Sequence, residues 1–259
     1  MPELPDLQVF SRNLQQKLSG KKLEKITIIN DSKLKISAKE FKKNLEKKQL
    51  KKLYREGKEL RFEFEDGNTM GLHLMLNGNM HFFEKHNEHK NTIIELLFDD
   101  DTGLAVTDYQ GMATVALNPE KKVSPDALSG EADFSYLKEK LSKTRTTIKN
   151  LLLDQKIIRG IGNAYADEIL WHARISPFSV CNKIPADKIK ALTKSITTTL
   201  NNAEKQILKS HPGIITGEIR DFLDIHNSKK KQSPNGADIL QKVVGGRKTY
   251  YTDEQEFYK

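Results

Sequence analysis

The chain has 259 residues, and its 43 Lys and Arg exceed its 35 Asp and Glu, giving a formal net charge of +8. This surplus favours a polyanionic partner, because cations placed on phosphates release condensed counterions. The single cysteine, Cys181, excludes a disulfide framework and a zinc site built from several cysteines. No apolar run approaches the roughly 18 residues of a membrane-spanning helix, and no secretion signal opens the chain, so we expect a cytoplasmic protein without membrane contact.

The N-terminal part predicts one helix followed by a sheet. Apolar residues recur at helical spacing within residues 4–19, and Gly20 would end this helix. Alternating apolar residues then continue to about residue 117, interrupted by Asp-Gly, Asn-Gly and Thr-Gly turns that are typical of antiparallel strands. We therefore expect residues 1–119 to form a helix and a largely antiparallel sandwich or barrel.

The second half predicts helices and a final hairpin. Residues 120–131 are polar, lack a strand pattern and are interpreted as a linker. Residues 132–222 are expected to be helical. The predicted helical stretches are 134–155, 163–175 and 186–211. The last part, 223–259, begins with a basic loop and ends in two short strands around a Gly-Gly turn.

The segment 151–170 holds the most specific candidate site. Gly160 and Gly162 would let the chain turn sharply into a helix, whose first N–H groups, together with Asn163, could hold a phosphate. Spacing alone equally supports a helix-loop-helix in which the glycines only permit the turn.

Four separated stretches together resemble the formamidopyrimidine-DNA glycosylase / endonuclease VIII family. They are MPELPD, REGKEL, LLLDQKIIRGIGNAYADEILWHARISP and VVGGRKTYYT, in the order found in that family, and the resemblance covers essentially the whole chain. It implies an α+β fold, with an N-terminal antiparallel β-sandwich and leading helix, a helix-two-turn-helix domain and a β-hairpin finger. It also implies a monomeric base-excision enzyme of the bacterial nucleoid, acting on double-stranded DNA that contains damaged bases or abasic sites.

The resemblance assigns the chemistry to Pro2, Glu3 and Lys58. With Met1 removed, Pro2 would attack C1′ of the damaged nucleotide and expel the base through a Schiff base, followed by β- and δ-elimination. A free α-amine suits this step, because its reference pKa of about 7.7–8.0 leaves neutral amine near pH 7. Glu3 would be the acid/base at the sugar, and Lys58 would reach a phosphate near the lesion. Taken without the resemblance, these residues indicate only a frayed terminus and a solvated lysine.

Three further residues match phosphate-binding positions of the family: Lys156 and Asn163 in the helix-two-turn-helix, and Arg247 in the finger. Glu168 fits the same motif, and we expect it to stabilise the helix rather than to take part in the reaction. Asp6 stands where the family usually has Glu, and we expect it to tune the site.

The finger departs from the family pattern. Family members usually carry Cys-x₂-Cys-x₁₆-Cys-x₂-Cys, a strong zinc signature. The four positions here are Gln232, Asn235, Thr252 and Gln255. Amide and hydroxyl groups are poor ligands for Zn²⁺, so we expect no metal and no other cofactor, and activity that survives chelators. The resemblance then implies a zincless hairpin that still presents Arg247; a decayed finger without function is the alternative.

Base flipping leaves a hole in the duplex that inserted side chains fill. By position in the HLMLNG and DYQGMA segments, the candidates are Leu76, Gln110 and Met112. Gln110 stands where the formamidopyrimidine branch has an Arg that pairs with the base opposite the lesion, so we expect a weaker preference for cytosine there. Packing within strands is an equally good interpretation of Leu76 and Met112.

The connection from the last helix to the finger is short, whereas the formamidopyrimidine branch carries a longer segment that caps 8-oxoguanine. We therefore expect 8-oxoguanine not to be the preferred lesion, and oxidised pyrimidines, ring-opened purines and abasic sites to be better substrates. Two alternatives stay open. One is a lyase acting mainly on abasic or single-stranded sites, and the other is a catalytically silent protein that binds damaged DNA.

Overall fold

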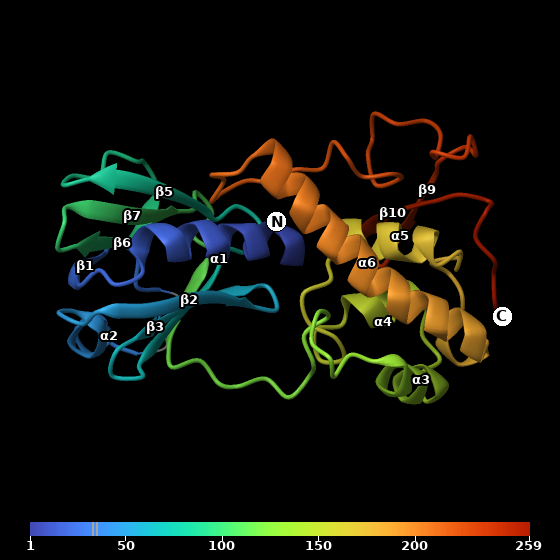
Figure 1. The fold of residues 1–259 in the computed structure, drawn as a ribbon, viewed down its shortest axis with the longest axis horizontal. Coiled ribbons are helices and arrows are strands. Elements are labelled where there is room, and N and C mark those ends of the chain that lie inside the picture. The colour runs from blue at the N-terminus through green and yellow to red at the C-terminus, as the bar shows by residue number, and fades with distance from the viewer. Residues whose placement is uncertain (33, 35) are drawn as a thin grey trace. The chain divides into compact units, whose positions relative to one another are not determined.

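The computed structural model describes residues 1–32, 34 and 36–259. These residues divide into two compact units. Unit 1 comprises residues 1–2, 6–121 and 207–218, and unit 2 comprises residues 3–5, 122–206 and 219–259. Figure 1 shows a strand-rich unit 1 and a mainly helical unit 2. Within the described residues, no helix is both long and apolar enough to cross a membrane.

Unit 1 is built on two antiparallel four-stranded sheets, with the strand orders β1-β6-β7-β5 and β2-β3-β4-β8. The strands are β1 (Leu23–Ile28), β2 (Leu50–Glu56), β3 (Glu59–Phe64), β4 (Thr69–His73), β5 (Asn79–Glu84), β6 (Thr92–Phe98), β7 (Thr102–Thr107) and β8 (Thr114–Leu117). Buried side chains of both sheets, such as Ile26 in β1 and Phe62 in β3, belong to one core. The expected antiparallel β-sandwich is confirmed.

The helix predicted over residues 4–19 is α1 (Leu4–Leu18). Its Leu7, Phe10 and Leu14 are buried in the core of unit 1, and each such side chain contributes about 1.5–3 kcal/mol. A second helix, α2 (Ala38–Leu45), was not predicted. Its start is marked by a capping contact, because the Ser37 hydroxyl accepts a hydrogen bond from the Glu40 N–H at 3.1 Å.

Unit 2 contains the helices α3 (Phe134–Ser142), α4 (Ile148–Leu153), α5 (Asn163–His172) and α6 (Ala186–Ser210), with a 3₁₀ turn η1 (Cys181–Lys183). The single helical stretch expected over 134–155 is wrong, since the chain leaves the helix at Lys143 and re-enters it after Thr147. The interruption follows from local hydrogen bonds. The Thr147 hydroxyl caps α4 by accepting from the Asn150 N–H, and the Thr146 carbonyl accepts from the Cys181 N–H at 3.1 Å.

The predicted C-terminal hairpin is present as β9 (Leu240–Val244) and β10 (Arg247–Tyr251). Gly245 and Gly246 connect the two strands with φ of +55° and +74°. Both values lie in the left-handed region, which two-residue hairpin turns of this kind require and glycine adopts without strain.

The thiol of Cys181 is buried in unit 2, with 0% of the residue exposed. Burial raises the pKa of this thiol to about 12, so almost no thiolate exists at neutral pH. We therefore expect the native protein not to react with a thiol reagent at pH 8, and to react at once in denaturant. Rapid labelling of the native protein would contradict this packing.

Candidate active site

Glu3 caps the N-terminus of α5 within unit 2. Its Oε1 accepts a hydrogen bond from the Ala164 N–H at 3.0 Å, and its Oε2 accepts one from the Tyr165 N–H at 3.3 Å. The N-cap residue of α5 is Gly162, which has no side chain for this purpose. Helix N-termini attract anions because their N–H groups are unpaired and the helix dipole is positive there. Glu3 is only 5% exposed, and these two hydrogen bonds fix the position and orientation of its carboxylate.

The two glycines before α5 make room for residues 3–5. A Cβ atom on Gly162 would lie 2.2 Å from Cδ of Glu3, and one on Gly160 would lie 2.5 Å from Cδ1 of Leu4. Gly160 also has φ of +102°, and its carbonyl accepts from the Leu4 N–H at 3.2 Å. The glycines therefore do more than permit a turn. The expectation that helix N–H groups hold a phosphate here is corrected for Ala164 and Tyr165, since their N–H groups bind Glu3.

Pro2 is buried and belongs to unit 1, directly before Glu3 in the chain. Met1 precedes it, and the Met1 ammonium forms an ion pair with the Glu218 carboxylate, also in unit 1. As long as Met1 is attached, the Pro2 nitrogen is an amide without a basic lone pair. Removal of Met1 is therefore a chemical requirement for a nucleophilic Pro2.

Lys58 lies in the two-residue loop that connects β2 to β3 in unit 1, where Glu56 and Glu59 are the last paired residues. Gly57 takes φ of +59° in this loop, and its carbonyl accepts from the Arg55 guanidinium at 3.0 Å. Lys58 is therefore carried by a short hairpin loop whose backbone is hydrogen-bonded.

Asn163 is the first residue of α5, and its amide Nδ2 donates to the Lys248 carbonyl in β10 at 2.9 Å. Its Oδ1 is buried and has no hydrogen-bond partner among the described residues. The amide group carries two N–H donors, and this contact uses one of them. Asn163 is thereby linked to β10, the strand that begins with the exposed Arg247, and both predicted residues lie in unit 2.

The buried Lys149 in α4 strengthens the same link. Its Nζ lies 2.6 Å from Oδ1 of Asp167 in α5 and donates to the Thr249 hydroxyl of β10 at 2.8 Å. Burial lowers the pKa of Lys149, and the charge of Asp167 opposes this shift. The other Asp167 oxygen accepts from the Tyr250 N–H at 2.9 Å. The hairpin is therefore held against α4 and α5 by buried polar contacts.

Lys156 is exposed in the turn between α4 and α5. The preceding Gln155 holds this turn, because its Nε2 donates to the carbonyls of Leu153 and Ile161 and its Oε1 accepts from the Gly160 N–H. Lys156 and Asn163 thus stand at the two ends of one well-bonded turn.

Glu168 has the expected structural role. Its carboxylate accepts three backbone N–H groups, from Asp224, Ile225 and His226, at 2.7–2.9 Å. Burial raises the pKa of Glu168, while these hydrogen bonds oppose the shift. Glu168 also lies near His172 and Asp224, a grouping that could suit a cation. Its oxygens are already used by the backbone, so we do not assign a metal to it.

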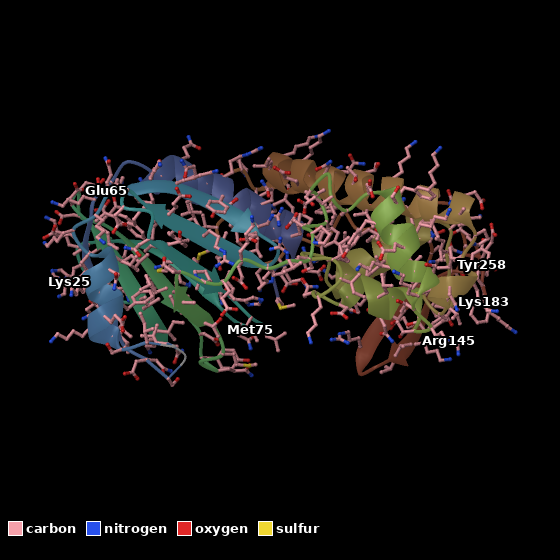
Figure 2. All side chains as sticks on the ribbon, turned by 90° about the horizontal axis from the view of Figure 1, so that it is seen from below. Lys25, Glu65, Met75, Arg145, Lys183 and Tyr258 are labelled. Carbon is pink, nitrogen blue, oxygen red and sulfur yellow. The ribbon has the colours of Figure 1, made fainter. Side chains whose placement is uncertain are left out.

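Two loops of unit 1 carry the residues expected to fill the hole in the duplex. Leu76 lies between β4 and β5 and is 57% exposed, so it is not packed within a strand. Gln110 and the half-buried Met112 lie between β7 and β8. The loops are joined by a hydrogen bond of 2.6 Å from Asn77 Nδ2 to Gln110 Oε1. Met75 marks the first loop in Figure 2.

Asp108 holds the backbone of the second loop, between β7 and β8, by hydrogen bonds. The carboxylate of Asp108 accepts the N–H groups of Gln110, Met112 and Ala113 at 2.7–2.9 Å. Tyr109, which the sequence interpretation did not include, is 68% exposed on this loop. The signal was available, since an aromatic residue directly precedes Gln110 in the DYQGMA segment.

The four finger positions that lack cysteine engage in hydrogen bonds. Gln232 donates to Asp238 at 3.3 Å, and Gln255 donates to the Ile175 carbonyl at 2.8 Å. Asn235 and Thr252 both donate to Glu254, at 2.7 and 3.0 Å. Donor groups that face carboxylate and carbonyl oxygens are not arranged as ligands of a cation. The geometry therefore does not fit a zinc ion.

Two models of protein domains match the chain. The model of the "Formamidopyrimidine-DNA glycosylase N-terminal domain" matches residues 1–115, and that of the "Formamidopyrimidine-DNA glycosylase H2TH domain" matches residues 123–210. The formamidopyrimidine-DNA glycosylase of Lactobacillus gasseri is 32% identical over the full length of both chains. That of Mycoplasma mobile is 30% identical over 97% of each.

Solved structures of Lactococcus lactis Fpg are also similar to this chain. A complex with DNA containing an abasic site has a TM-score of 0.89 and 27% identity, covering 98% of this chain and 100% of the other. A complex with DNA containing an oxidised pyrimidine has the same TM-score and coverage at 28% identity.

Proposed function

Because the chain belongs to the formamidopyrimidine-DNA glycosylase / endonuclease VIII family, we propose that it is a bifunctional DNA glycosylase and abasic-site lyase of base excision repair. Its partner is double-stranded DNA with damaged bases or abasic sites. The observation that carries the proposal is the position of the Glu3 carboxylate. The residue after Pro2 has its carboxylate fixed on the N-terminus of α5, although a flexible terminus would be expected to leave it loose.

The chemistry follows from the two N-terminal residues. After removal of Met1, the lone pair of the Pro2 nitrogen attacks C1′, the glycosidic bond breaks, and the base leaves with a proton. The first adduct still has a closed sugar ring; breaking its C1′–O4′ bond, with a proton passed to O4′, opens the ring. Since Pro is a secondary amine, the product is an iminium ion that stays charged and makes the C2′ proton acidic. Loss of that proton expels the 3′ phosphate, and a second elimination expels the 5′ phosphate. Glu3 serves as the acid/base at the sugar.

The proposed phosphate contacts come from both units. Lys58 belongs to unit 1, whereas Lys156, Asn163 and Arg247 belong to unit 2. Each cation placed on a phosphate releases counterions, so affinity for DNA should fall steeply as salt is raised.

For the lesion, we propose oxidised pyrimidines, ring-opened purines and abasic sites in preference to 8-oxoguanine. The connection that enters the finger is short, and Glu168 binds three successive N–H groups of it, from Asp224 to His226. A connection held to α5 in this way is poorly suited to fold over a large base as a flap.

An assay of strand cleavage tests the proposed function. Duplexes carry an abasic site, dihydrouracil, thymine glycol, ring-opened guanine or 8-oxoguanine. We expect cleavage that leaves phosphate at both ends of a one-nucleotide gap, with slow release of 8-oxoguanine opposite cytosine. Cleavage of the abasic duplex alone would favour the lyase that acts mainly on abasic sites. Binding without any cleavage would favour the silent binding protein.

We further propose that Tyr109 stacks on a base at the flipped site. Tyr109→Ala should weaken binding to an abasic-site duplex about fivefold or more, since a base stacked on an aromatic side chain contributes about 1–3 kcal/mol. Tyr109→Phe should bind like the wild type, because it keeps the ring. Phe257, 52% exposed in unit 2, supplies the control Phe257→Ala. Equal dissociation constants for Tyr109→Ala and wild type would rule out the stacking.

A further inference from the structure

Glu254 follows β10 in the finger and receives five side-chain donors among the described residues. They are Nε1 of Trp171 (3.0 Å), the guanidinium of Arg174 (2.6 Å), the hydroxyl of Ser233 (2.9 Å), Nδ2 of Asn235 (2.7 Å) and the hydroxyl of Thr252 (3.0 Å). The Glu254 side chain is 17% exposed. Hydrogen bonds to an ionised carboxylate are shorter and stronger than those between neutral groups.

The donors come from three separate parts of unit 2. Ser233 and Asn235 lie in the loop before the hairpin, and Thr252 directly follows β10. Trp171 lies near the end of α5, and Arg174 comes two residues after that helix. One carboxylate therefore ties the segments before and after the hairpin to each other and to α5.

Burial acts to raise the pKa of Glu254. Hydrogen bonds from Asn235, Arg174, Trp171 and Ser233 act to lower it and together outweigh burial, so the net shift is downward. The carboxylate is therefore ionised at neutral pH. The carboxylate is partly buried, and donors that share one acceptor group in such a network strengthen one another, which makes the arrangement cooperative.

We infer that Glu254 is the organising centre of the finger and a positioning residue for Arg247. An anion surrounded by donors here performs the task that a cation surrounded by thiolates performs in cysteine-containing fingers. Two of the four cysteine-equivalent positions, Asn235 and Thr252, donate directly to it. Arg247 begins β10 and Thr252 directly follows it, so a fixed Thr252 anchors the far end of the strand that presents the arginine. The inference rests on the proposed function.

The test compares Glu254→Gln with the control Glu256→Gln, whose carboxylate lies two residues away and forms a surface ion pair with Lys188. Binding is measured to a duplex with a tetrahydrofuran abasic-site analogue. We expect Glu254→Gln to bind about tenfold more weakly, the effect of losing one charge-assisted network, and Glu256→Gln to bind like the wild type. Trp171 is the only tryptophan of the chain, so its fluorescence should change in Glu254→Gln and not in the control.

A double-mutant cycle separates positioning from simple stability. If Glu254 acts through Arg247, then adding Glu254→Gln to Arg247→Ala should cost no further affinity. At saturating enzyme, Glu254→Gln should cleave near the wild-type rate, because Glu254 is not among the groups proposed to react with the sugar. Full additivity of the two losses, or wild-type affinity of Glu254→Gln, would overturn the inference. If instead the wild type neither binds nor cleaves abasic duplexes, the proposed function itself fails.

A zinc site introduced into the finger gives an independent test of the inference. Glu254→Ala combined with Q232C, N235C, T252C and Q255C should bind one zinc ion and regain the affinity that Glu254→Ala alone loses. Removing the zinc should abolish that gain. Failure to bind zinc, or zinc binding without recovered affinity, would contradict the view that the finger is organised around this point.

Discussion

Pro2→Gly is expected to lower the rate of strand cleavage at an abasic site by at least about 100-fold, because the nucleophile becomes a more mobile primary amine whose imine is not permanently charged. Acetylating the amine of the wild-type protein should abolish cleavage. Binding to the tetrahydrofuran duplex serves as the control and should stay near the wild-type affinity, since Pro2 is not proposed to hold phosphate. The readout is a single-turnover rate with enzyme in excess.

Two results would contradict this assignment. One is a Pro2→Gly variant that cleaves at the wild-type rate. The other is full activity of a protein that retains Met1, because an amide nitrogen at Pro2 cannot attack C1′. Intact-mass measurement of the purified protein shows which form is assayed.

The second large effect is expected at Gly162. Gly162→Ala places a methyl group 2.2 Å from Cδ of Glu3, so the carboxylate must leave the N-terminus of α5. We expect about a 100-fold slower reaction, within the range that a positioned acid/base contributes. Stability should fall by about 1–3 kcal/mol, the usual cost of overpacking a buried site.

Gly130→Ala is the matched control for this variant. Gly130 also lies in unit 2, and apart from its two chain neighbours no described residue has an atom within 4 Å of a Cβ built there. Its single-turnover rate and its free energy of unfolding should both stay near those of the wild type. If Gly162→Ala has the same single-turnover rate as Gly130→Ala, then the position of the Glu3 carboxylate on α5 does not matter for the reaction.

Local pattern predicted much of the fold. The helical spacing of Leu7, Phe10 and Leu14 located α1, and the Gly-Gly turn located the C-terminal hairpin. The helix α2 could have been found, because Ser37 followed by Glu40 has the spacing of a capping box. The break between α3 and α4 was harder to see, since it depends on a contact with Cys181, which is distant in sequence.

The parts of the site that escaped prediction are long-range contacts of ordinary residue types. The bonds from Ala164 and Tyr165 to Glu3 join residues more than 160 positions apart, and no periodicity encodes such a pairing. Glu254 stands in a polar stretch of the chain as one acidic residue among many. Its importance comes from donors on α5 and on the segments before and after the hairpin, which only the tertiary fold brings to one carboxylate.

The most direct test of the catalytic assignment is to locate the covalent bond. The wild-type protein is incubated with an abasic-site duplex and sodium borohydride, which reduces a Schiff base to a stable amine. The adduct is then digested and its peptides are analysed by mass spectrometry. We predict that the DNA remnant is attached to an N-terminal peptide that begins with Pro2 and lacks Met1. Attachment to a lysine side chain, such as that of Lys58, would contradict the account.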